Sequence, residues 1–495
     1  AQAGATFHSG FATIWYQWKN MLITPFYWLI GPFYRRSERT TIGEIMEDRY
    51  GKVMGIVYFV FAIMFFVFSM GSMLQGAAKI IAIASGGLIS ANAVVLTMTV
   101  AFIIYSFAGG LIAAAYTDFI QSFLIIILSI LLIPLGLKEI GGFTGLKQAL
   151  PENYFQLFDK SVGMDFFTIS MLTMNGILGI TSQPHMLSMY ATGRTERGGR
   201  IGQTFGSLFK RLMTIGWALT GLIIAALVLK NGVTLDDPEM AFGYGSRELL
   251  GSGLKGLMLA AIVATNMSSC SNFMVNTGAL FTRNIYKRYM NPEADDRKLL
   301  WIGRVSGLGI SLLGVLFALS IDNVLHAFLF TETTAAFIGI VFLGGILWKR
   351  ANRYGAGAAV ITSFVTYYLV NYLNTGVITL IYTWTPGPFG LAMLVGFGSF
   401  WLVSVMTKKE DPARIDSFFD RMRRKSDADV PEGAEKPLAE NTGDDLLLLD
   451  LPGWMTRRRW RNFFSRYRED LVGFVLSWVV VGLLILIAWL ILQLG

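Results

Sequence analysis

The sequence contains an apolar segment that carries a run of neutral, oxygen-bearing side chains, 259-LAAIVATNMSSCSNFMVN-276. On a helix, Thr265, Ser268 and Ser269 stand at i, i+3 and i+4, so their hydroxyls share one face. Hydroxyl and carbonyl oxygens suit a hard monovalent cation such as sodium, which must be held and then released. The alternative is that small polar residues only join closely packed helices.

The composition is typical of a polytopic membrane protein. Of the 495 residues, 54% are hydrophobic and 15% are charged, whereas soluble domains carry about 25% charged residues. The net charge of +8 therefore relates to membrane topology and does not indicate a nucleic-acid partner. The single cysteine, Cys270, excludes an internal disulfide. We find no nucleophile–base pair, metal-ligand cluster or phosphate-binding loop in the sequence, so an enzyme is not predicted.

Twelve apolar runs are long enough to cross a bilayer, which takes roughly 20 residues. They lie near 11–34, 53–82, 91–109, 111–137, 166–191, 212–230, 253–282, 300–321, 324–348, 355–373, 387–407 and 471–495. The sequence therefore predicts an all-α polytopic membrane protein.

Basic residues concentrate in alternate connecting segments, whereas the loops near 85–91 and 374–386 contain no Lys or Arg. By the positive-inside rule, the segments 35–52, 192–211 and 408–470 are predicted to be cytoplasmic. The basic residues counted in the second of these segments include Lys210 and Arg211 at its end. We expect an integral protein of a bacterial inner membrane, with its tail in the cytoplasm.

Three regions follow from this pattern: a transmembrane core (1–407), a cytoplasmic linker (408–470) and a C-terminal membrane helix (471–495). The end of the linker, 454-WMTRRRWRNFFSRYRED-470, interleaves arginines with aromatic residues. That pattern predicts a helix lying on the anionic inner leaflet of the lipid bilayer. An ordinary positive flank beside a membrane helix is the alternative.

Four stretches resemble a known family when taken in this order and spacing. They are 108-AGGLIAAAYTDFIQ-121, 183-QPHMLSMYATGRTERGGRIG-202, 253-GLKGLMLAAIVATNMSS-269 with its exit 281-FTRNIYKRY-289, and 343-LGGILWKRANRYGAG-357. Over about residues 41 to 357 the chain resembles the sodium:solute symporter family, which includes sodium-coupled sugar, proline, pantothenate and sialic acid carriers.

The resemblance implies a LeuT-like fold: two inverted five-helix repeats with the substrate near the midplane of the membrane, here with additional C-terminal helices. The expected function is sodium-coupled symport of a small polar organic solute by alternating access. The competing hypothesis is a non-transporting relative that acts as a sensor or as a structural subunit of a larger membrane complex, together with other membrane subunits.

The resemblance also implies a sodium (Na+) site between the first and eighth core helices. Its ligands would be the carbonyl of Thr265, the hydroxyls of Ser268 and Ser269, and backbone carbonyls of a broken first helix. The family usually has a small apolar residue where Thr265 stands, but a backbone carbonyl is unaffected by that change. The family's leading helix and the first half of its broken helix would precede Ala1, so we expect that residues upstream of Ala1 complete this site.

A second sodium site is implied by the same resemblance in some members. Asp118 and Ser271 stand at matching places, and Asn272 stands where a serine is expected. An ionisable residue within a membrane segment is a functional candidate by default. The alternative is that Asp118 pairs with a cytoplasmic basic loop.

Two further features are candidates for the substrate pocket. Asn175 and Gly176 interrupt an apolar helix where the sixth core helix of the family breaks, so freed backbone groups could face the cavity. The alternative is that the glycine only eases packing. Glu332 lies near midplane depth, where an unpaired carboxylate costs several kcal/mol. It is expected to meet a cation, a proton or a polar substrate, or to pair structurally with Lys19 or His326. Nothing in these residues identifies the solute.

Overall fold

The computed structural model describes residues 2–191, 193, 195–423, 446–449, 460 and 463–495, without the side chains of 108–119 and 191. All named elements in this part of the chain are helices. The membrane-scale helices are α2 (Trp15–Arg36), α4 (Lys52–Ala84), α5 (Ala91–Ile140), α7 (Phe166–Thr181), α9 (Glu196–Lys230), α11 (Ser252–Phe281), α12 (Asp296–Ser320), α13 (Val324–Leu347), α14 (Arg353–Thr375), α15 (Pro386–Met406) and α19 (Arg468–Gln493).

Shorter helices connect or extend these elements. They are α1 (Gln2–Ser9), η1 (Phe11–Ile14), α3 (Ile42–Tyr50), α6 (Gly142–Ala149), η2 (Glu152–Phe155), η3 (Lys160–Val162), α8 (Met186–Ala191), η4 (Pro238–Met240), α10 (Ala241–Leu249), the π-helix η5 (Thr282–Met290), α16 (Pro412–Arg423) and α18 (Phe463–Arg466).

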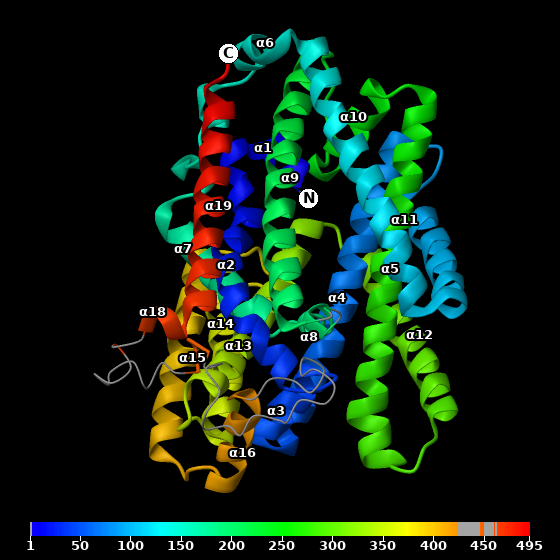
Figure 1. The fold of residues 1–495 in the computed structure, drawn as a ribbon. Coiled ribbons are helices and arrows are strands. Elements are labelled where there is room, and N and C mark those ends of the chain that lie inside the picture. Colours follow the sequence, from blue (N-terminus) through cyan, green and yellow to red (C-terminus); the bar gives the residue numbers. More distant parts are fainter. Residues whose placement is uncertain (1, 192, 194, 424–445, 450–459, 461–462) are drawn as a thin grey trace.

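Each of the twelve predicted apolar runs contains a helix, and the run at 166–191 is interrupted between α7 and α8. Within the described residues, nine helices are long and apolar enough to cross a membrane, and Ala91–Phe107 and Phe166–Thr181 are shorter apolar helices. The remaining run corresponds to α2. Two of the predicted runs fall in α5, whose ribbon doubles back before it climbs to α6 (Figure 1).

The helices form two groups, each with its own apolar core. One core gathers buried side chains of α2, α7, α9, α13 and α14. The second gathers side chains of α5, α11 and α12. Helix α4 belongs to both cores, because its first half packs in one and its second half in the other. In Figure 1, α5, α11 and α12 lie together on one side of α4, and α2, α7 and α13 lie on the other side.

Several of the long helices begin at a polar residue whose side chain caps the helix N-terminus. The side chain of Asp165 accepts a hydrogen bond from the Thr168 amide at the start of α7. Thr195 caps α9 in the same way, through the amide of Gly198. Such caps satisfy amide groups that have no partner within the helix. As a result α9 begins well before the apolar run that the sequence analysis placed at 212–230.

Helices α7 and α13 approach each other closely at a glycine. A Cβ added to Gly339 would lie 2.0 Å from the carbonyl oxygen of Leu178. Because that neighbour is backbone, it has little freedom to move away, and only glycine permits this separation. The contact fixes α13 against α7 next to the central cavity described below.

Basic residues of the segments predicted to be cytoplasmic also have structural partners. Arg49 of α3 donates hydrogen bonds to the carbonyl oxygens of Gly345 and Ala351, at 2.8 and 3.0 Å, around the end of α13. Arg414 of α16 donates to the carbonyl oxygen of Asp48 at 2.9 Å. These cations meet the carbonyl-rich ends of helices, where positive charge is favourable. They attach α16 to α3 and α3 to α13.

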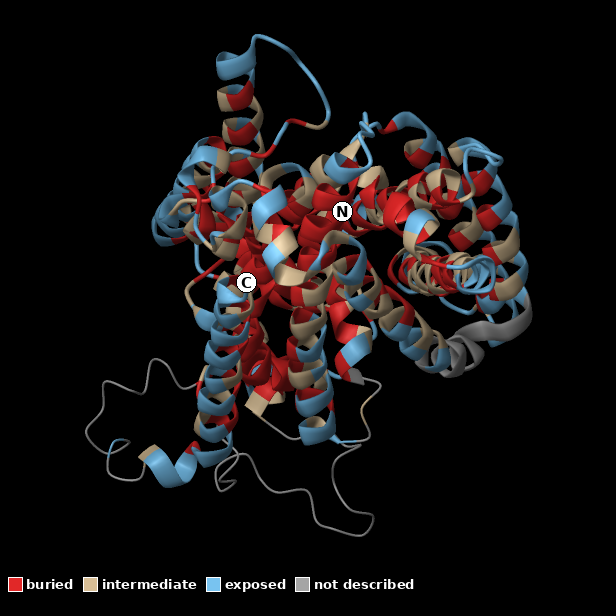
Figure 2. Ribbon diagram, turned by 90° about the horizontal axis from the view of Figure 1, so that it is seen from above, coloured by how far each residue is buried: buried red, intermediate tan, exposed pale blue. Residues whose placement is uncertain are grey.

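The outer faces of the helices are exposed, while buried residues gather toward the interior (Figure 2). Many of the exposed side chains are large and apolar. Leu316 of α12, Ile361 of α14, Leu394 of α15 and Val479 of α19 are examples of large exposed side chains. Exposed apolar surface of this extent is suited to lipid contact. Residues 454–459, 461 and 462 of the basic segment predicted at 454–470 lie outside the described residues; within its described part, Phe463–Arg466 is helical and α19 begins at Arg468.

Candidate functional site

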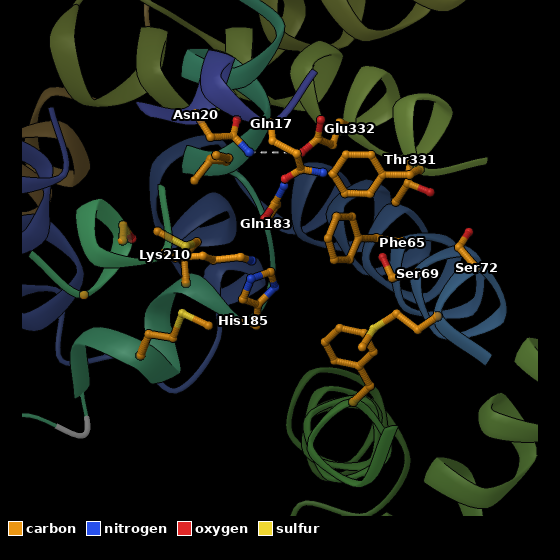
Figure 3. Close-up of a pocket in the computed structure, with 18 of the residues that line it drawn as sticks. Gln17, Asn20, Phe65, Ser69, Ser72, Gln183, His185, Lys210, Thr331 and Glu332 are labelled. Carbon is orange, nitrogen blue, oxygen red and sulfur yellow. Dashed lines mark hydrogen bonds between the residues drawn. The ribbon is translucent and has the colours of Figure 1, made fainter. Parts of the chain in front are cut away.

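A cavity of about 600 Å³ lies among the helices of the first group. Its walls come from α2, α4, the α7–α8 segment, α9 and α13, and Phe273 of α11 is also among its lining residues. The polar side chains in the walls include Gln17, Asn20, Ser69, Ser72, Gln183, His185, Lys210, Thr331 and Glu332 (Figure 3). Arg211 also lines the cavity. A volume of this size suits a small organic solute.

The predicted interruption of the sixth core helix at Asn175 and Gly176 is wrong. Helix α7 is continuous from Phe166 to Thr181. Asn175 is fully buried and donates a hydrogen bond to the Thr333 hydroxyl at 2.9 Å, which holds α7 to α13. A Cβ at Gly176 would lie 2.2 Å from the Ile23 side chain, so this glycine serves close packing.

The helix breaks instead after Thr181, between α7 and α8. This interruption carries Gln183 and His185, and both side chains line the cavity. Tyr58 of α4 donates to the carbonyl oxygen of Ser182 at 2.7 Å, so a backbone group freed by the break has a partner. Irregular backbone at membrane depth is tolerated where it is buried in protein or lines a cavity. Within the motif 183-QPHM, the proline was the available signal for this break.

Glu332 forms an ion pair with Lys19, and both side chains are almost completely buried. The amide of Asn20 lies 3.5 Å from the other carboxylate oxygen. Of the partners considered from the sequence, the structure thus selects Lys19. The pair links α2 to α13 at the wall of the cavity. Pairing offsets the cost of burying each charge, because two opposite charges attract strongly where water is scarce.

Two cationic residues of the cavity were misplaced by the sequence analysis. Lys210 and Arg211 were assigned to a cytoplasmic loop, but both belong to α9, which begins at Glu196. At 1.5 Å per residue, Lys210 lies roughly 21 Å along this helix. Both residues line the cavity. The apolar run starts only at residue 212. A prediction from hydropathy alone therefore placed the end of the loop too far along the chain.

The residues predicted to bind the first sodium ion lie on α11. Ser268 is buried, whereas Thr265 and Ser269 are half-buried. The Thr265 hydroxyl donates to the carbonyl oxygen of Ala261 in its own helix at 2.9 Å. Helix α11 packs chiefly against α4, α5 and α12, and the described α1 packs chiefly against α9. Helix α11 therefore supplies the serine hydroxyl oxygens on its own side of the predicted sodium site.

The residues of the predicted second sodium site are only partly described. The hydroxyl of Ser106 in α5 donates to the hydroxyl of Ser271 at 2.8 Å, and both side chains are buried. Asn272 follows on α11 and is half-buried. The side chain of Asp118 lies outside the described residues. Ser106, which the sequence analysis did not single out, adds an oxygen beside Ser271.

These features define a class of protein: an integral membrane carrier with a polar, charged cavity enclosed by membrane helices. Residues 2–363 match the sodium:solute symporter family model. The chain belongs to this family. It is a sodium-coupled symporter of a small solute and not an enzyme.

Similar proteins agree with this assignment. The chain is 28% identical over 431 residues to the osmoregulated proline transporter OpuE of Bacillus subtilis, covering 84% of this chain and 85% of that protein. It is 26% identical over 388 residues to the high-affinity proline transporter PutP of the same organism, covering 77% of this chain and 79% of that protein.

A solved structure of a Na+-coupled sialic acid symporter, in a substrate-bound outward-open state, has a similar fold. The TM-score is 0.63 with 17% sequence identity, over 82% of this chain and 86% of that chain. This likeness confirms the LeuT-like fold expected from the sequence.

The buried Lys19–Glu332 pair leads to a prediction about stability. Glu332→Gln and Lys19→Gln should each destabilise the protein by about 3–5 kcal/mol, because each leaves one buried charge unpaired. The double variant should recover most of that loss, since two neutral side chains replace the pair. Thermal unfolding of the purified protein in detergent measures all three. A double variant whose loss equals the sum of the two single losses would contradict the pairing.

Proposed function

We propose that the central cavity binds the transported solute and that sodium binds beside α11. The observation that carries this proposal is the charged and polar cavity of about 600 Å³, enclosed by α2, α4, α7–α8, α9 and α13. Its size and mixed lining fit a small polar organic molecule. The two similar proteins named as proline transporters make proline one candidate solute.

For the first sodium ion, we propose the Thr265 carbonyl and the Ser268 and Ser269 hydroxyls as ligands. The three residues lie on one stretch of α11, and Ser268 and Ser269 are neighbours there with different degrees of burial. For a second ion, we propose Asp118, Ser271 and Asn272. The buried contact between Ser106 and Ser271 supports this proposal, because it brings a further oxygen to the same place.

Transport would proceed by alternating access, with one helix group moving against the other. The two apolar cores support this proposal, because each group buries its own side chains and can move as a unit. The residues that line the proposed solute cavity lie mainly in the first helix group. The sodium ligands proposed on α11 lie in the second group. Sodium bound between the groups would thus favour the arrangement that also binds the solute.

We also propose the topology and the division into a core (1–407), a linker (408–470) and a C-terminal helix (471–495). The linker and the segment 35–52 would face the cytoplasm of a bacterial cell. The basic segment 454–470 would lie on the anionic inner leaflet. Contacts between α3 and α16 support a common side for the first two segments, since Arg421 forms an ion pair with Asp48 at 2.7 Å.

The topology can be checked by cysteine labelling in intact cells that carry the Cys270→Ser variant. Single cysteines at Thr40 and Ser417, which are both exposed, should resist a membrane-impermeant thiol reagent, whereas a cysteine at Ser85 should react. Permeabilised cells provide the control, because there the two cytoplasmic positions become accessible. Labelling of Thr40→Cys and Ser417→Cys in intact cells would overturn the orientation.

The sodium site predicts the response of transport to hydroxyl removal. Ser269→Ala should weaken the apparent sodium affinity by about five- to a hundredfold, which corresponds to about 1–3 kcal/mol for a lost buried partner. Saturating sodium should restore much of the transport rate. Thr265→Ala is the matched control, because only its backbone carbonyl is proposed to bind.

The measurement is sodium-dependent uptake of labelled solute into proteoliposomes, preceded by a screen of amino acids, sugars and carboxylates. If Ser268→Ala/Ser269→Ala and the wild type need the same sodium concentration for half-maximal uptake, the two hydroxyls serve helix packing alone.

A further inference from the structure

The charges around the central cavity do not cancel. Lys19 and Glu332 neutralise each other as an ion pair. Lys210 and Arg211 also line the cavity, and among the described residues neither forms an ion pair. Two positive charges therefore remain in the cavity wall, where they are available to a counter-charge.

Arg211 is held in a position that leaves part of its guanidinium group unused. Its side chain is buried, and one terminal nitrogen donates to the amide oxygen of Gln17 at 3.3 Å. The Nε atom is buried and has no hydrogen-bond acceptor among the described residues. The backbone of the same residue accepts a hydrogen bond from the Trp18 indole at 3.4 Å, which fixes α9 against α2. A rigid guanidinium with a free donor is suited to bind an anionic oxygen.

Lys210 is more accessible than its neighbour. Its side chain is exposed to the cavity and extends toward His185 (Figure 3). Gly202 and Gly206 stand eight and four residues earlier on the same helix, and both line the cavity. A Cβ added at either glycine would meet no atom within 4 Å, so the space beside Lys210 is open along this face of α9.

The remaining walls are suited to an organic body. Phe65 and Phe328 provide apolar surface, and Ser69, Ser72 and Thr331 provide hydroxyls. In Figure 3, Ser69 and Ser72 lie on the far side of Phe65 from Lys210. A cavity of about 600 Å³ is much larger than an inorganic anion requires. The anionic group of a solute would thus meet α9 while its body contacts α4 and α13.

We propose that the solute carried by this protein is a small organic carboxylate, whose carboxylate is bound by Lys210 and Arg211. This inference rests on the proposed function, because it assumes that the central cavity is the solute site. Lys210 and Arg211 act here as specificity-determining residues. The paired Glu332 does not oppose an anionic solute, since Lys19 compensates its charge.

The test uses the purified full chain in detergent with sodium present, and it reads ligand binding from the rise in unfolding temperature. The probes are pairs that differ in charge: gluconate and glucose, lactate and lactamide, L-proline and L-prolinamide. The carboxylate member of at least one pair should stabilise the protein and its uncharged or amide counterpart should not. Lys210→Gln should weaken binding of that carboxylate about ten- to a hundredfold, and Lys210→Arg should retain most of it.

Lys230→Gln is the matched control, because Lys230 ends the same helix, is exposed and lies 4.0 Å from Glu139. It should bind the carboxylate as the wild type does. A second control replaces the chloride of the buffer by methanesulfonate. If the site binds only inorganic chloride, the unfolding temperature will depend on chloride and will not change with the organic probes.

The outcomes distinguish this inference from the proposed function. Sodium-dependent binding of glucose, lactamide or L-prolinamide as tight as that of the matching acid would overturn the carboxylate preference while leaving symport intact. Stabilisation by none of the three carboxylates, or by chloride alone, would also overturn it. Failure of the proposed function would appear differently, as sodium that neither stabilises the protein nor promotes the binding or uptake of any solute.

Discussion

The structure depends on how charge is accommodated inside the membrane. Lys19 and Glu332 are buried where an isolated ion would cost several kcal/mol. Their pairing makes α2 and α13 neighbours across the cavity, and Asn175 with Thr333 then ties α7 to the same helix. The close approach of Gly339 to Leu178 permits that contact. The walls of the solute cavity are thus set by polar partners that the bilayer itself does not provide.

In our proposal, sodium binding is coupled to solute binding because the two ligands bind to different helix groups. The cavity is lined mostly by helices of the first core, and the polar face of α11 belongs to the second. Helix α4 contributes Ser69 and Ser72 to the cavity and packs in both cores. In our proposal, sodium on α11 and solute in the cavity therefore act on one common element. Neither ligand needs to contact the other for each to favour the same arrangement.

Much of the fold, but less of the site, followed from the sequence. Apolar runs located the membrane helices, because every spanning helix must bury about 20 apolar residues. The same criterion failed for Lys210 and Arg211, since a helix that lines a cavity can carry charge inside the membrane. The break of α7 was assigned to Asn175 and Gly176, but these residues serve contacts with α13 and α2. The choice of Lys19 as the partner of Glu332 depends on packing between distant segments, which local patterns do not contain.

The central claim is that the cavity holds the solute and that sodium controls its occupancy. The most direct measurement is the labelling rate of a cysteine at Ser69, introduced in the Cys270→Ser protein, with a hydrophilic thiol reagent. A transported solute should slow labelling when sodium is present and should have no effect when choline replaces sodium. Labelling that is equally fast with and without a transported solute, at saturating sodium, would contradict the assignment of the cavity as the solute site.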